Sequence, residues 1–336
     1  MNLLLFLSDR CNMACDYCFL DLNGRPGAVL SEGDASRALD RHLAAHGPRA
    51  RVTILGGEPL LHPELALAVA RRARAGGAKT TLVTNALKAT PALASELAGL
   101  GVELSASVDG PAEVHDAHRR MAGGAPSHAA VAAALERLDP RDWRVNLVLT
   151  EDTAGRLLSS VEWLRARGFK KLSFHADVRA PWSDGAHAAL VAALEGFGRY
   201  ARALRAAAPD ALALWHLEGF LAPAAVAPGD ELVLGADGRY YASGAFLAKP
   251  YGSAPEGMIG DARTGPDLAR RAAILAEAAA GASAALAGRP VYTPPLESWL
   301  LAKVRGGDAA AAVRAFARAD AAIGAALSPL AREAVA

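Results

Sequence analysis

The sequence is organised around one segment, residues 8–20, which reads Ser8-Asp9-Arg10-Cys11-Asn12-Met13-Ala14-Cys15-Asp16-Tyr17-Cys18-Phe19-Leu20. This cysteine loop holds all three cysteines of the 336-residue chain, in the spacing C-x-x-x-C-x-x-C. It directly follows an apolar run, residues 3–7, that is typical of a buried strand. A strand that leads into a loop with three thiols predicts a site for a soft metal centre.

The spacing by itself leaves several centres open. A structural zinc ion takes four protein ligands, and the chain has no fourth cysteine, although one of its nine histidines could supply the last ligand. A [4Fe-4S] cluster held by three thiolates would keep one iron open for a ligand that is not protein. Three clustered cysteines without a metal are the remaining alternative. A disulfide framework is disfavoured, because three is an odd number and nothing indicates secretion.

The cysteine loop resembles the signature of the radical SAM superfamily, in which an aromatic residue stands just before the third cysteine, as Tyr17 does here. The resemblance implies that Cys11, Cys15 and Cys18 bind a [4Fe-4S] cluster whose open iron chelates S-adenosylmethionine, with Tyr17 near the adenine. It also implies an enzyme that forms a 5′-deoxyadenosyl radical and abstracts a hydrogen atom from its substrate. In such enzymes the cofactor supplies the chemistry, and the protein supplies binding and orientation.

Composition excludes several other classes. The residues are 52% hydrophobic and the formal net charge is +1, which suits one large domain or one domain with an appendage. The near-neutral charge gives no support for nucleic-acid or membrane-surface binding. No signal peptide is recognisable, and no apolar run reaches the roughly 20 residues of a membrane span. Because a thiolate cluster needs a reducing compartment, we expect a cytoplasmic protein.

Strand-like and helix-like segments alternate in the first half of the chain and beyond. The predicted strands are residues 2–7, 52–55, 80–83, 103–108, 144–149 and 171–174. The predicted helices are residues 32–45, 63–75, 91–100, 127–138, 155–167 and 186–207, with Ser31 as an N-cap and Pro63 and Pro91 in first turns. This order predicts an α/β fold with a parallel sheet. The resemblance implies a partial (β/α)6 TIM-like barrel over residues 1–228, with its chemistry at the carboxyl ends of the strands.

The second and third predicted strands end in candidate cofactor contacts. Gly56, Gly57 and Glu58, followed by proline, resemble the GGEP motif of the family, which binds the amino group of S-adenosylmethionine. An ordinary turn is the alternative, because glycine and proline are common in turns. Thr84 and Asn85 follow the third strand and can reach the ligand or cap a helix. The family has glycine at the next position, and Ala86 makes a left-handed backbone there less expected.

The fourth strand leads into Ser107-Val108-Asp109-Gly110-Pro111 and then into residues 114–120, VHDAHRR. This resembles the S-x-D-G-P and H-D-x-x-R segments of radical SAM enzymes that modify peptides and proteins, which implies that Ser107 and Arg119 contact the ribose and carboxylate of the cofactor. Arginine suits a carboxylate because its fork makes paired charged hydrogen bonds. Arg120 is the fallback. We expect three neighbours, Asp109, His115 and Asp116, to form a polar network, and a metal site is the alternative.

The fifth and sixth strands carry further polar residues. We expect Asn146 to point into the barrel toward the cofactor. His175 and Asp177 end the sixth strand, with Arg179 and Trp182 just beyond, and polar groups at this place are candidate catalytic or substrate contacts. A hydrogen-bonded loop cluster is the alternative. Residues 215–218, WHLE, are a further candidate for closing the barrel mouth.

After residue 228 the character of the sequence changes. Two strand-like runs flank an Asp-Gly turn at Asp237, which predicts a hairpin, and the order of motifs resembles the start of a SPASM or twitch extension. Ser243 stands where that family has a cysteine, so the resemblance implies an extension that has lost its auxiliary clusters. Any ordinary hairpin is the alternative. Residues 266–336 are expected to be amphipathic helices, so the second region, 229–336, combines a hairpin with a helical tail.

The missing thiols restrict the expected chemistry. Without cysteines for auxiliary clusters, we rank a rearrangement, an elimination or carbon–carbon bond formation above a net dehydrogenation. Tyr240 or Tyr241 could donate a hydrogen atom in place of a cysteine, although packing roles are the alternative for both. A single cluster also requires an external electron donor, such as a flavodoxin- or ferredoxin-like protein.

The substrate is the least determined feature. The strand-four segment and the hairpin point to a ribosomal peptide or a protein side chain, as in the maturation of ribosomally made peptides. Because the sequence starts at Met1, we expect a leader peptide to need another docking surface or a separate protein. A small-molecule substrate such as a sugar, nucleoside or amino acid is the alternative, and a non-catalytic iron–sulfur or zinc regulator is an alternative of another class.

Overall fold

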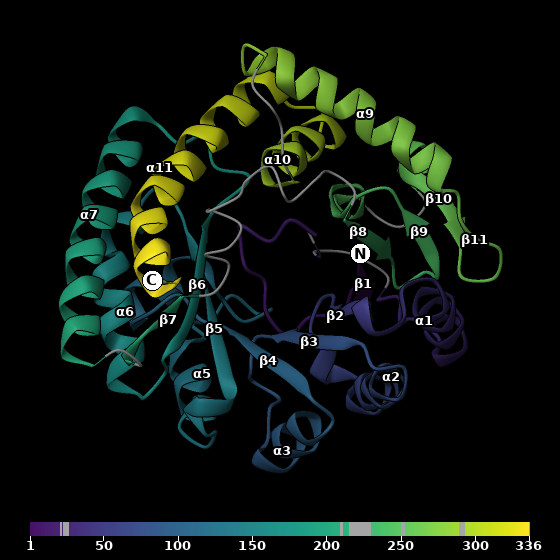
Figure 1. The fold of residues 1–336 in the computed structure, drawn as a ribbon, viewed down its shortest axis with the longest axis horizontal. Coiled ribbons are helices and arrows are strands. Elements are labelled where there is room, and N and C mark those ends of the chain that lie inside the picture. Colours follow the sequence, from purple (N-terminus) through teal and green to yellow (C-terminus); the bar gives the residue numbers. More distant parts are fainter. Residues whose placement is uncertain are drawn as a thin grey trace.

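The computed structural model describes residues 1–20, 22, 27–208, 211–214, 230–249, 253–288 and 293–335. In this part of the chain a curved sheet lies at the centre, with helices around its outside (Figure 1). The sheet has eleven strands in the order β11-β10-β9-β8-β1-β2-β3-β4-β5-β6-β7. The strands from β1 to β7 are parallel to their neighbours, and β8 is parallel to β1. A mostly parallel sheet in a partial barrel was predicted from the alternating pattern, and it is confirmed.

The first six strands match the six predicted ones closely, and a seventh short strand follows them. They are β1 (Asn2–Phe6), β2 (Arg51–Leu55), β3 (Lys79–Thr84), β4 (Val102–Ser107), β5 (Trp143–Leu149), β6 (Lys171–Ala176) and the additional short β7 (Ala213–Leu214). The helices between them are α1 (Glu32–His46), α2 (Pro63–Ala75), α3 (Pro91–Gly99), α4 (Ala112–His118), α5 (His128–Leu135), α6 (Leu157–Ala166) and α7 (Asp184–Ala207).

Local chemistry explains most of the helix starts. The Ser31 hydroxyl accepts a hydrogen bond from the Asp34 backbone N–H, and Pro63 and Pro91 lie in first turns, as predicted. The short helix α4 falls in a segment that was interpreted as a loop. It has no side-chain cap and only seven residues, so it leaves little periodic signal in the sequence.

Alternation along the strands separates a core from a polar barrel interior. Leu3, Leu5, Ile54 and Leu104 are fully buried and belong to the hydrophobic core. The residues that alternate with these along each strand face the inside of the curved sheet, and in several strands they are polar. They include Asn2 and Thr53, which hydrogen-bond to each other near the amino ends of β1 and β2. The inside of the barrel is therefore lined for polar contacts rather than filled only with aliphatic side chains.

The C-terminal region adds strands to the same sheet. The predicted hairpin is present as β8 (Glu231–Leu234) and β9 (Arg239–Tyr241), which are antiparallel around Asp237-Gly238. Two further antiparallel strands follow, β10 (Met258–Asp261) and β11 (Gly265–Pro266), with the 3-10 turn η7 (Gly244–Ala248) between β9 and β10. Because β8 pairs with β1, the hairpin extends the barrel sheet directly beside the strand that leads into the cysteine loop.

Three helices complete the chain, as the Ala-rich pattern predicted. They are α9 (Leu268–Ala285), α10 (Thr293–Val304) and α11 (Ala309–Val335), and they form an arch from the β11 side of the sheet to α7 (Figure 1). In that arch α11 packs against α7 and β6, and α10 packs against η7. The described helices include none that is both long and apolar enough to cross a membrane.

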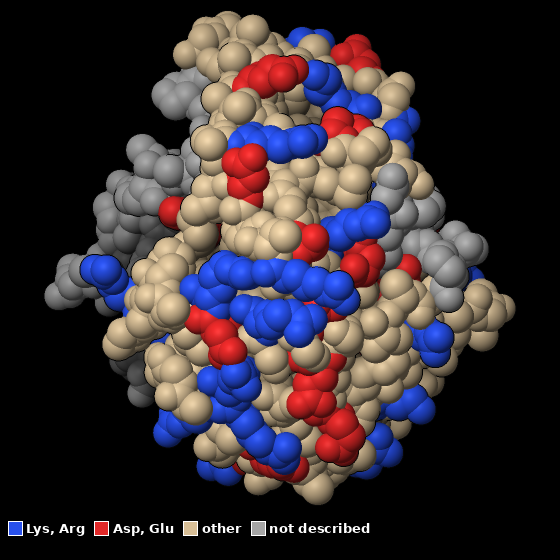
Figure 2. All heavy atoms as spheres, turned by 90° about the vertical axis from the view of Figure 1, so that its right-hand side faces the viewer, with Lys and Arg blue, Asp and Glu red and all other residues tan. Residues whose placement is uncertain are grey.

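Charges of both signs are interspersed on the side of the molecule that carries α1 and β11 (Figure 2). Ion pairs on α1 and α2 account for part of this pattern, with Arg37 bound to Asp34 and Arg72 bound to Asp40. Exposed pairs of this kind contribute little to stability. The mixed surface agrees with the near-neutral net charge of the sequence.

Candidate active site

The cysteine loop lies at the carboxyl end of β1 and is held on one side by the segment after α4. The backbone N–H of Ala14 donates to the carbonyl of Arg120 over 2.8 Å, and that of Ala122 donates to the carbonyl of Asn12 over 3.0 Å. Within the loop, the Cys18 N–H donates to the Cys15 carbonyl. These bonds fold residues 8–20 into a tight turn that keeps all three thiols on one short stretch of backbone.

The thiols themselves are partly buried. Burial raises the pKa of Cys11 to about 12 and that of Cys15 to about 11, with neighbouring Arg119 acting in the opposite direction on Cys15. Thiolates at such a place need positive charge beside them, which iron would supply if the three cysteines held it. No three His, Cys, Asp or Glu side chains in the described ranges are grouped to hold one metal ion, and a [4Fe-4S] cluster does not need such a group because each thiolate binds its own iron.

The Gly56-Gly57 turn packs directly on the cysteine loop. The Gly57 N–H donates to the Ser8 carbonyl over 2.6 Å, and the Glu58 N–H donates to the Arg10 carbonyl over 2.8 Å. A Cβ added at Gly57 would lie 2.1 Å from the Arg10 carbonyl oxygen, and one at Gly56 would lie 2.6 Å from that of Ser8. Only glycine permits this approach, so the structure brings the two glycines and the cysteines together, as the two motifs predicted.

The Glu58 carboxylate joins the ends of β2 and β3. Its oxygens accept hydrogen bonds from the Thr84 hydroxyl at 2.6 Å, the Asn85 N–H at 2.7 Å and the Leu60 N–H at 2.9 Å. Glu58 is buried, and burial raises its pKa. The sequence assigned Glu58 and Thr84 to the cofactor, but the structure shows their side chains bound to each other.

Asn85 and Ala86 continue this turn toward the cysteine loop. The Asn85 amide donates to the Asn12 side-chain oxygen at 2.7 Å, and its nitrogen lies 3.9 Å from Cys11 Sγ. The expectation for Ala86 was wrong: its φ is 65°, in the left-handed region that glycine would normally occupy. The Ala86 N–H donates to the Thr84 hydroxyl oxygen, so the tertiary arrangement of the turn imposes the conformation on alanine.

A buried ion pair lies beside Cys15. The Arg119 guanidinium donates to both carboxylate oxygens of Asp109, at 2.8 and 3.1 Å, and Asp109 also accepts from the Tyr17 hydroxyl at 2.5 Å. The Arg119 guanidinium carbon lies 5.1 Å from the centre of the Tyr17 ring. Burial acts to raise the pKa of Asp109, but the arginine outweighs it and the pKa is lowered. Burial raises the pKa of Tyr17, so Tyr17 stays a neutral donor.

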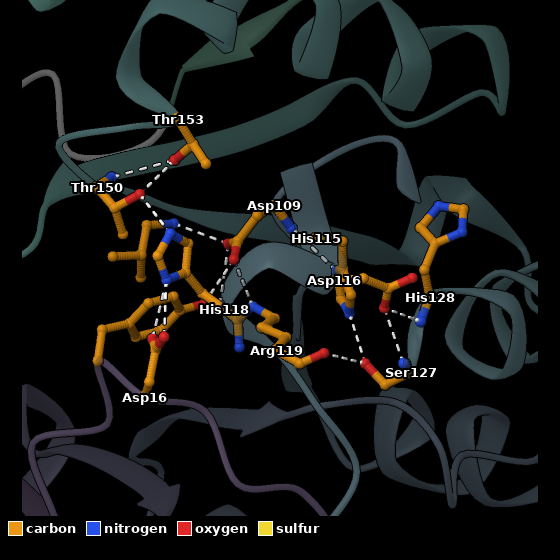
Figure 3. A network of polar contacts seen from close by, with 12 residues as sticks. Asp16, Asp109, His115, Asp116, His118, Arg119, Ser127, His128, Thr150 and Thr153 are labelled. Atoms are coloured by element: carbon orange, nitrogen blue, oxygen red, sulfur yellow. Dashed lines mark hydrogen bonds and ion pairs between the residues drawn. The ribbon is translucent and has the colours of Figure 1, made fainter. Parts of the chain in front are cut away.

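The neighbouring residues form the polar network that was expected (Figure 3). His115 contacts the Ser127 hydroxyl at 3.1 Å, and the Asp116 carboxylate accepts from the backbone N–H groups of Ser127 and His128. Burial lowers the pKa of His115 to about 4, so its ring is neutral. These contacts fix the segment after α4, against which the cysteine loop lies.

His118 is a site residue that the sequence did not single out. Its Nδ1 lies 2.9 Å from Asp16, in the cysteine loop (Figure 3). Its Nε2 lies 2.8 Å from Asp152, beyond β5. Burial acts to lower its pKa, but hydrogen bonds to the two carboxylates outweigh burial and raise the pKa. His118 thus ties the cysteine loop to the β5–α6 connection. In the sequence, its position beside Arg119 in the strand-four segment was the feature that could have indicated a place in the site.

Polar side chains follow β4, β5 and β6 across the inside of the barrel. Ser107, Asn146 and Ser173 stand at matching positions in neighbouring strands, and the Ser173 hydroxyl donates to the Asn146 side-chain oxygen over 2.8 Å. Two residues further along β6, His175 is exposed, whereas Phe174 beside it is buried against Phe197. His175 therefore lies on the same face as Ser173, which is the inside of the barrel.

The loop after β6 reaches back to the cysteine loop. Burial raises the pKa of Asp177, and the Asp177 backbone carbonyl accepts from the indole N–H of Trp182. The guanidinium of Arg179 donates to the carbonyls of Asp16 and Cys18. Arg179 was predicted as a candidate substrate contact, with a hydrogen-bonded loop cluster as the alternative. Its bonds to residues 161 and 163 positions earlier in the chain leave no local pattern in the sequence.

Two other predicted positions lie elsewhere. Tyr241 is buried in β9, beyond β8 from the barrel strands, and its hydroxyl donates to Asp237 at 2.8 Å. Ser243 follows it and donates to the carboxylate of Glu297 on α10 at 2.6 to 2.7 Å. Residues 215–218, the candidate for closing the barrel mouth, lie outside the described residues.

Comparison with known families finds one match in the first half of the chain. A model of the radical SAM superfamily matches residues 5–153, a range that includes the cysteine loop, the Gly56-Gly57 turn, Asp109 and Arg119. The chain thus carries a radical SAM domain. It is an enzyme that uses S-adenosylmethionine radical chemistry, with a [4Fe-4S] cluster and S-adenosylmethionine as cofactors.

Solved structures show the same fold over a larger part of the chain. A structure of anSMEcpe with bound S-adenosylmethionine superposes with a TM-score of 0.65 at 18% identity, covering 81% of this chain and 79% of that one. SuiB from Streptococcus suis bound to S-adenosylmethionine gives a TM-score of 0.54 at 17% identity, covering 73% of this chain and 60% of that one. The shared fold therefore continues beyond residue 153.

Proposed function

We propose that Cys11, Cys15 and Cys18 hold the [4Fe-4S] cluster and that S-adenosylmethionine lies against the Gly56-Gly57 backbone. The observation that carries this proposal is the close packing of that turn on the cysteine loop, where a Cβ at Gly57 would overlap the Arg10 carbonyl. When bound, the two cofactors supply a 5′-deoxyadenosyl radical that abstracts a hydrogen atom from the substrate. The protein has to bind, orient and shield the reacting groups.

The cofactor contacts follow from the position of the polar residues. Backbone groups of Gly56 and Gly57 suit the amino group, since the Glu58 carboxylate is already bound by Thr84 and Asn85. Arg119 supplies a fixed positive charge for the carboxylate and is held in place by Asp109. We assign three further predicted contacts to the same cofactor: Tyr17, beside Arg119, to the adenine, and Ser107 and Asn146, which pair in β4 and β5, to the ribose.

The substrate we propose is a peptide or protein side chain. Support comes from two structures of similar fold that contain peptides. The structure of anSMEcpe with the Cp18Cys peptide has a TM-score of 0.63 at 17% identity, covering 80% of this chain and 79% of that one. The structure of SuiB with its precursor peptide SuiA has a TM-score of 0.51 at 15% identity, covering 71% of this chain and 58% of that one. In this chain the exposed His175 and the partly buried Asp177 stand at the end of β6, and we assign them to the substrate. Tyr241 serves packing of the hairpin.

The reaction we propose needs no second cluster. The position that a SPASM or twitch cysteine would take is Ser243, bound to Glu297, and the three cysteines of this chain all lie in the cysteine loop. We therefore favour a rearrangement, an elimination or carbon–carbon bond formation, with one electron delivered by a flavodoxin- or ferredoxin-like protein. The region from residue 229 then acts as an extension that adds strands to the barrel sheet beside β1 and carries no cluster.

Anaerobic reconstitution with iron and sulfide tests the proposal. We expect about four irons per chain, the electron paramagnetic resonance signal of one reduced [4Fe-4S] cluster, and release of 5′-deoxyadenosine after addition of S-adenosylmethionine and dithionite. Cys15→Ala should lose both the signal and the release. Signals from two clusters would contradict the single-cluster proposal, and a wild-type protein that binds iron without releasing 5′-deoxyadenosine would contradict the catalytic one.

Candidate peptides test the substrate class. A deuterium label on the attacked carbon should appear in 5′-deoxyadenosine only when the correct peptide is present. His175→Ala should lower this peptide-dependent transfer while leaving the basal cleavage of S-adenosylmethionine near the wild-type rate, and Asp177→Asn should lower the transfer as well. Transfer from a small molecule and from no peptide would overturn the peptide assignment without affecting the cofactor assignment.

A further inference from the structure

The guanidinium of Arg179 binds the cysteine loop between two of its cysteines. Its Nη1 donates to the Asp16 carbonyl at 2.5 Å and to the Cys18 carbonyl at 2.9 Å. In Cys18 only Cα and Cβ separate that carbonyl carbon from the thiol. A permanent positive charge therefore lies next to Cys18, the third predicted cluster ligand. Arg179 binds Asp16 and Cys18, whereas the segment after α4 binds Ala14 and Asn12 earlier in the cysteine loop.

The charge is held there by the loop after β6. The Asp177 N–H donates to the Leu149 carbonyl, which fixes the start of this loop to the end of β5. The Asp177 carboxylate accepts from the Arg179 backbone N–H, not from its guanidinium. At the other end of the loop, Trp182 is buried and its carbonyl accepts from Arg318 of α11. The loop is thus anchored on both sides of Arg179.

We propose that Arg179 is a positioning residue that raises the reduction potential of the cluster held by the cysteine loop. The inference rests on the proposed function, because it requires that the three cysteines bind the cluster. One-electron reduction by a low-potential donor lowers the total charge at the site by one, and no bond forms or breaks. A nearby cation stabilises the more negative reduced state, and hydrogen bonds around the ligands act in the same direction.

Substitution of Arg179 tests this with a readout that does not depend on turnover. The midpoint potential is measured by redox titration followed by electron paramagnetic resonance, on reconstituted protein without S-adenosylmethionine. Arg179→Gln should shift the potential to a more negative value, and Arg179→Lys, which keeps the charge, should retain most of the wild-type potential. Asp177→Asn removes the facing negative charge and should shift the potential in the opposite direction.

Arg318→Gln is the matched control, because it frees the other end of the same loop without contacting the cysteine loop. Its potential should equal that of the wild type. An unchanged potential in Arg179→Gln, or equal shifts in Arg179→Gln, Arg179→Lys and Arg318→Gln, would overturn the inference. If Arg179→Gln does not retain its cluster, the absence of a positive shift in Asp177→Asn would overturn it. A wild-type chain that assembles no cluster would instead refute the cysteine assignment, and this inference with it.

Discussion

Asp109 connects three parts of the site through one buried carboxylate. It accepts hydrogen bonds from Tyr17 in the cysteine loop, from Arg119 after α4 and from the Val148 N–H in β5. A buried ion pair adds little net stability, but removal of one partner leaves the other charge buried without compensation. Loss of Asp109 should therefore disturb the site strongly, although Asp109 is not itself a predicted ligand of the cluster or of S-adenosylmethionine.

Asp109→Asn should lower the free energy of unfolding by about 3–5 kcal/mol, because it leaves the Arg119 guanidinium without a counter-charge. Chemical denaturation of the reconstituted protein under anaerobic conditions measures the change. Asp139→Asn is the control, since Asp139 pairs with Arg141 at the exposed surface and its loss should leave unfolding nearly unchanged. Equal changes in the free energy of unfolding for the two substitutions would show that loss of the buried pair costs no more stability than loss of the exposed one.

Glu297 should make the stability of the chain depend on pH. Burial raises the pKa of this carboxyl from its ordinary value of 4.5 to about 7; the neighbouring Glu231 adds to the rise, and hydrogen bonds from Ser243 and Ala245 with the charge of Arg271 oppose it. A raised folded-state pKa favours the protonated form. Its contribution is complete below pH 4.5 and is lost as the pH rises through 7.

Relative to Glu297→Gln, the wild type should thus lose stability between pH 4.5 and 7, by at most about 1.4 kcal/mol per pH unit. Denaturation curves of both proteins at several pH values check this. Glu277→Gln, at an exposed position on α9, should show no such trend against the wild type. A constant difference between wild type and Glu297→Gln across this range would show that Glu297 is ionised throughout.

At the scale of elements, the site is built where the ends of β1, β2, β3 and β4 meet. Parallel strands place their carboxyl ends at one edge, and the Gly56-Gly57 turn then fixes the distance between β2 and the cysteine loop. The Gly57 N–H donates to the Ser8 carbonyl, and the next N–H, that of Glu58, donates to the Arg10 carbonyl. A side chain at Gly57 has to displace the loop, because the Arg10 carbonyl cannot rotate away as a flexible side chain would.

Gly57→Ala should reduce the release of 5′-deoxyadenosine by about 100-fold, since a displacement of about 1 Å in a reacting geometry costs that much, and it should lower the iron content. Gly99→Ala, at the end of α3, is the matched control because a Cβ there meets no atom within 4 Å. Iron analysis and chromatography of the nucleoside measure both effects. Wild-type release from Gly57→Ala would show that the turn and the loop are not in contact in the active enzyme.

Elements were predictable from the sequence where the signal is local. The boundaries of β1 to β6, the Ser31 cap and the Asp237 turn follow from short patterns of apolar, capping and turn residues. Ala86 was predicted wrongly because its conformation depends on Thr84 and on the packing of the whole turn. The contacts of His118 with Asp16 and of Arg179 with Cys18 join segments more than 100 residues apart, and no local pattern encodes such pairs.

At the scale of the molecule, the two regions of the sequence share one sheet. β1 lies between β2 and β8, so the strand that leads into the cysteine loop is completed by a strand from the C-terminal region. α11 covers α7 and β6 on the other side of the barrel. The C-terminal region is therefore part of the barrel structure and not a separate attachment.

A chain that ends at residue 228 should fail to fold, because β1 becomes an edge strand and the faces of α7 and β6 under α11 become exposed. We expect low solubility, weak near-ultraviolet circular dichroism and no cooperative unfolding, in comparison with the full chain. A soluble 1–228 fragment that unfolds cooperatively at the midpoint of the full chain would show that the barrel needs only its first seven strands.

The pairing of β1 with β8 also has a consequence for synthesis. β8 leaves the ribosome some 230 residues after β1, so until then the nascent chain carries an apolar strand with one open edge. Contacts of such long sequence separation slow folding and expose the intermediate to aggregation. Iron loading should therefore follow release of the finished chain, and slower expression at low temperature should increase the yield of loaded enzyme.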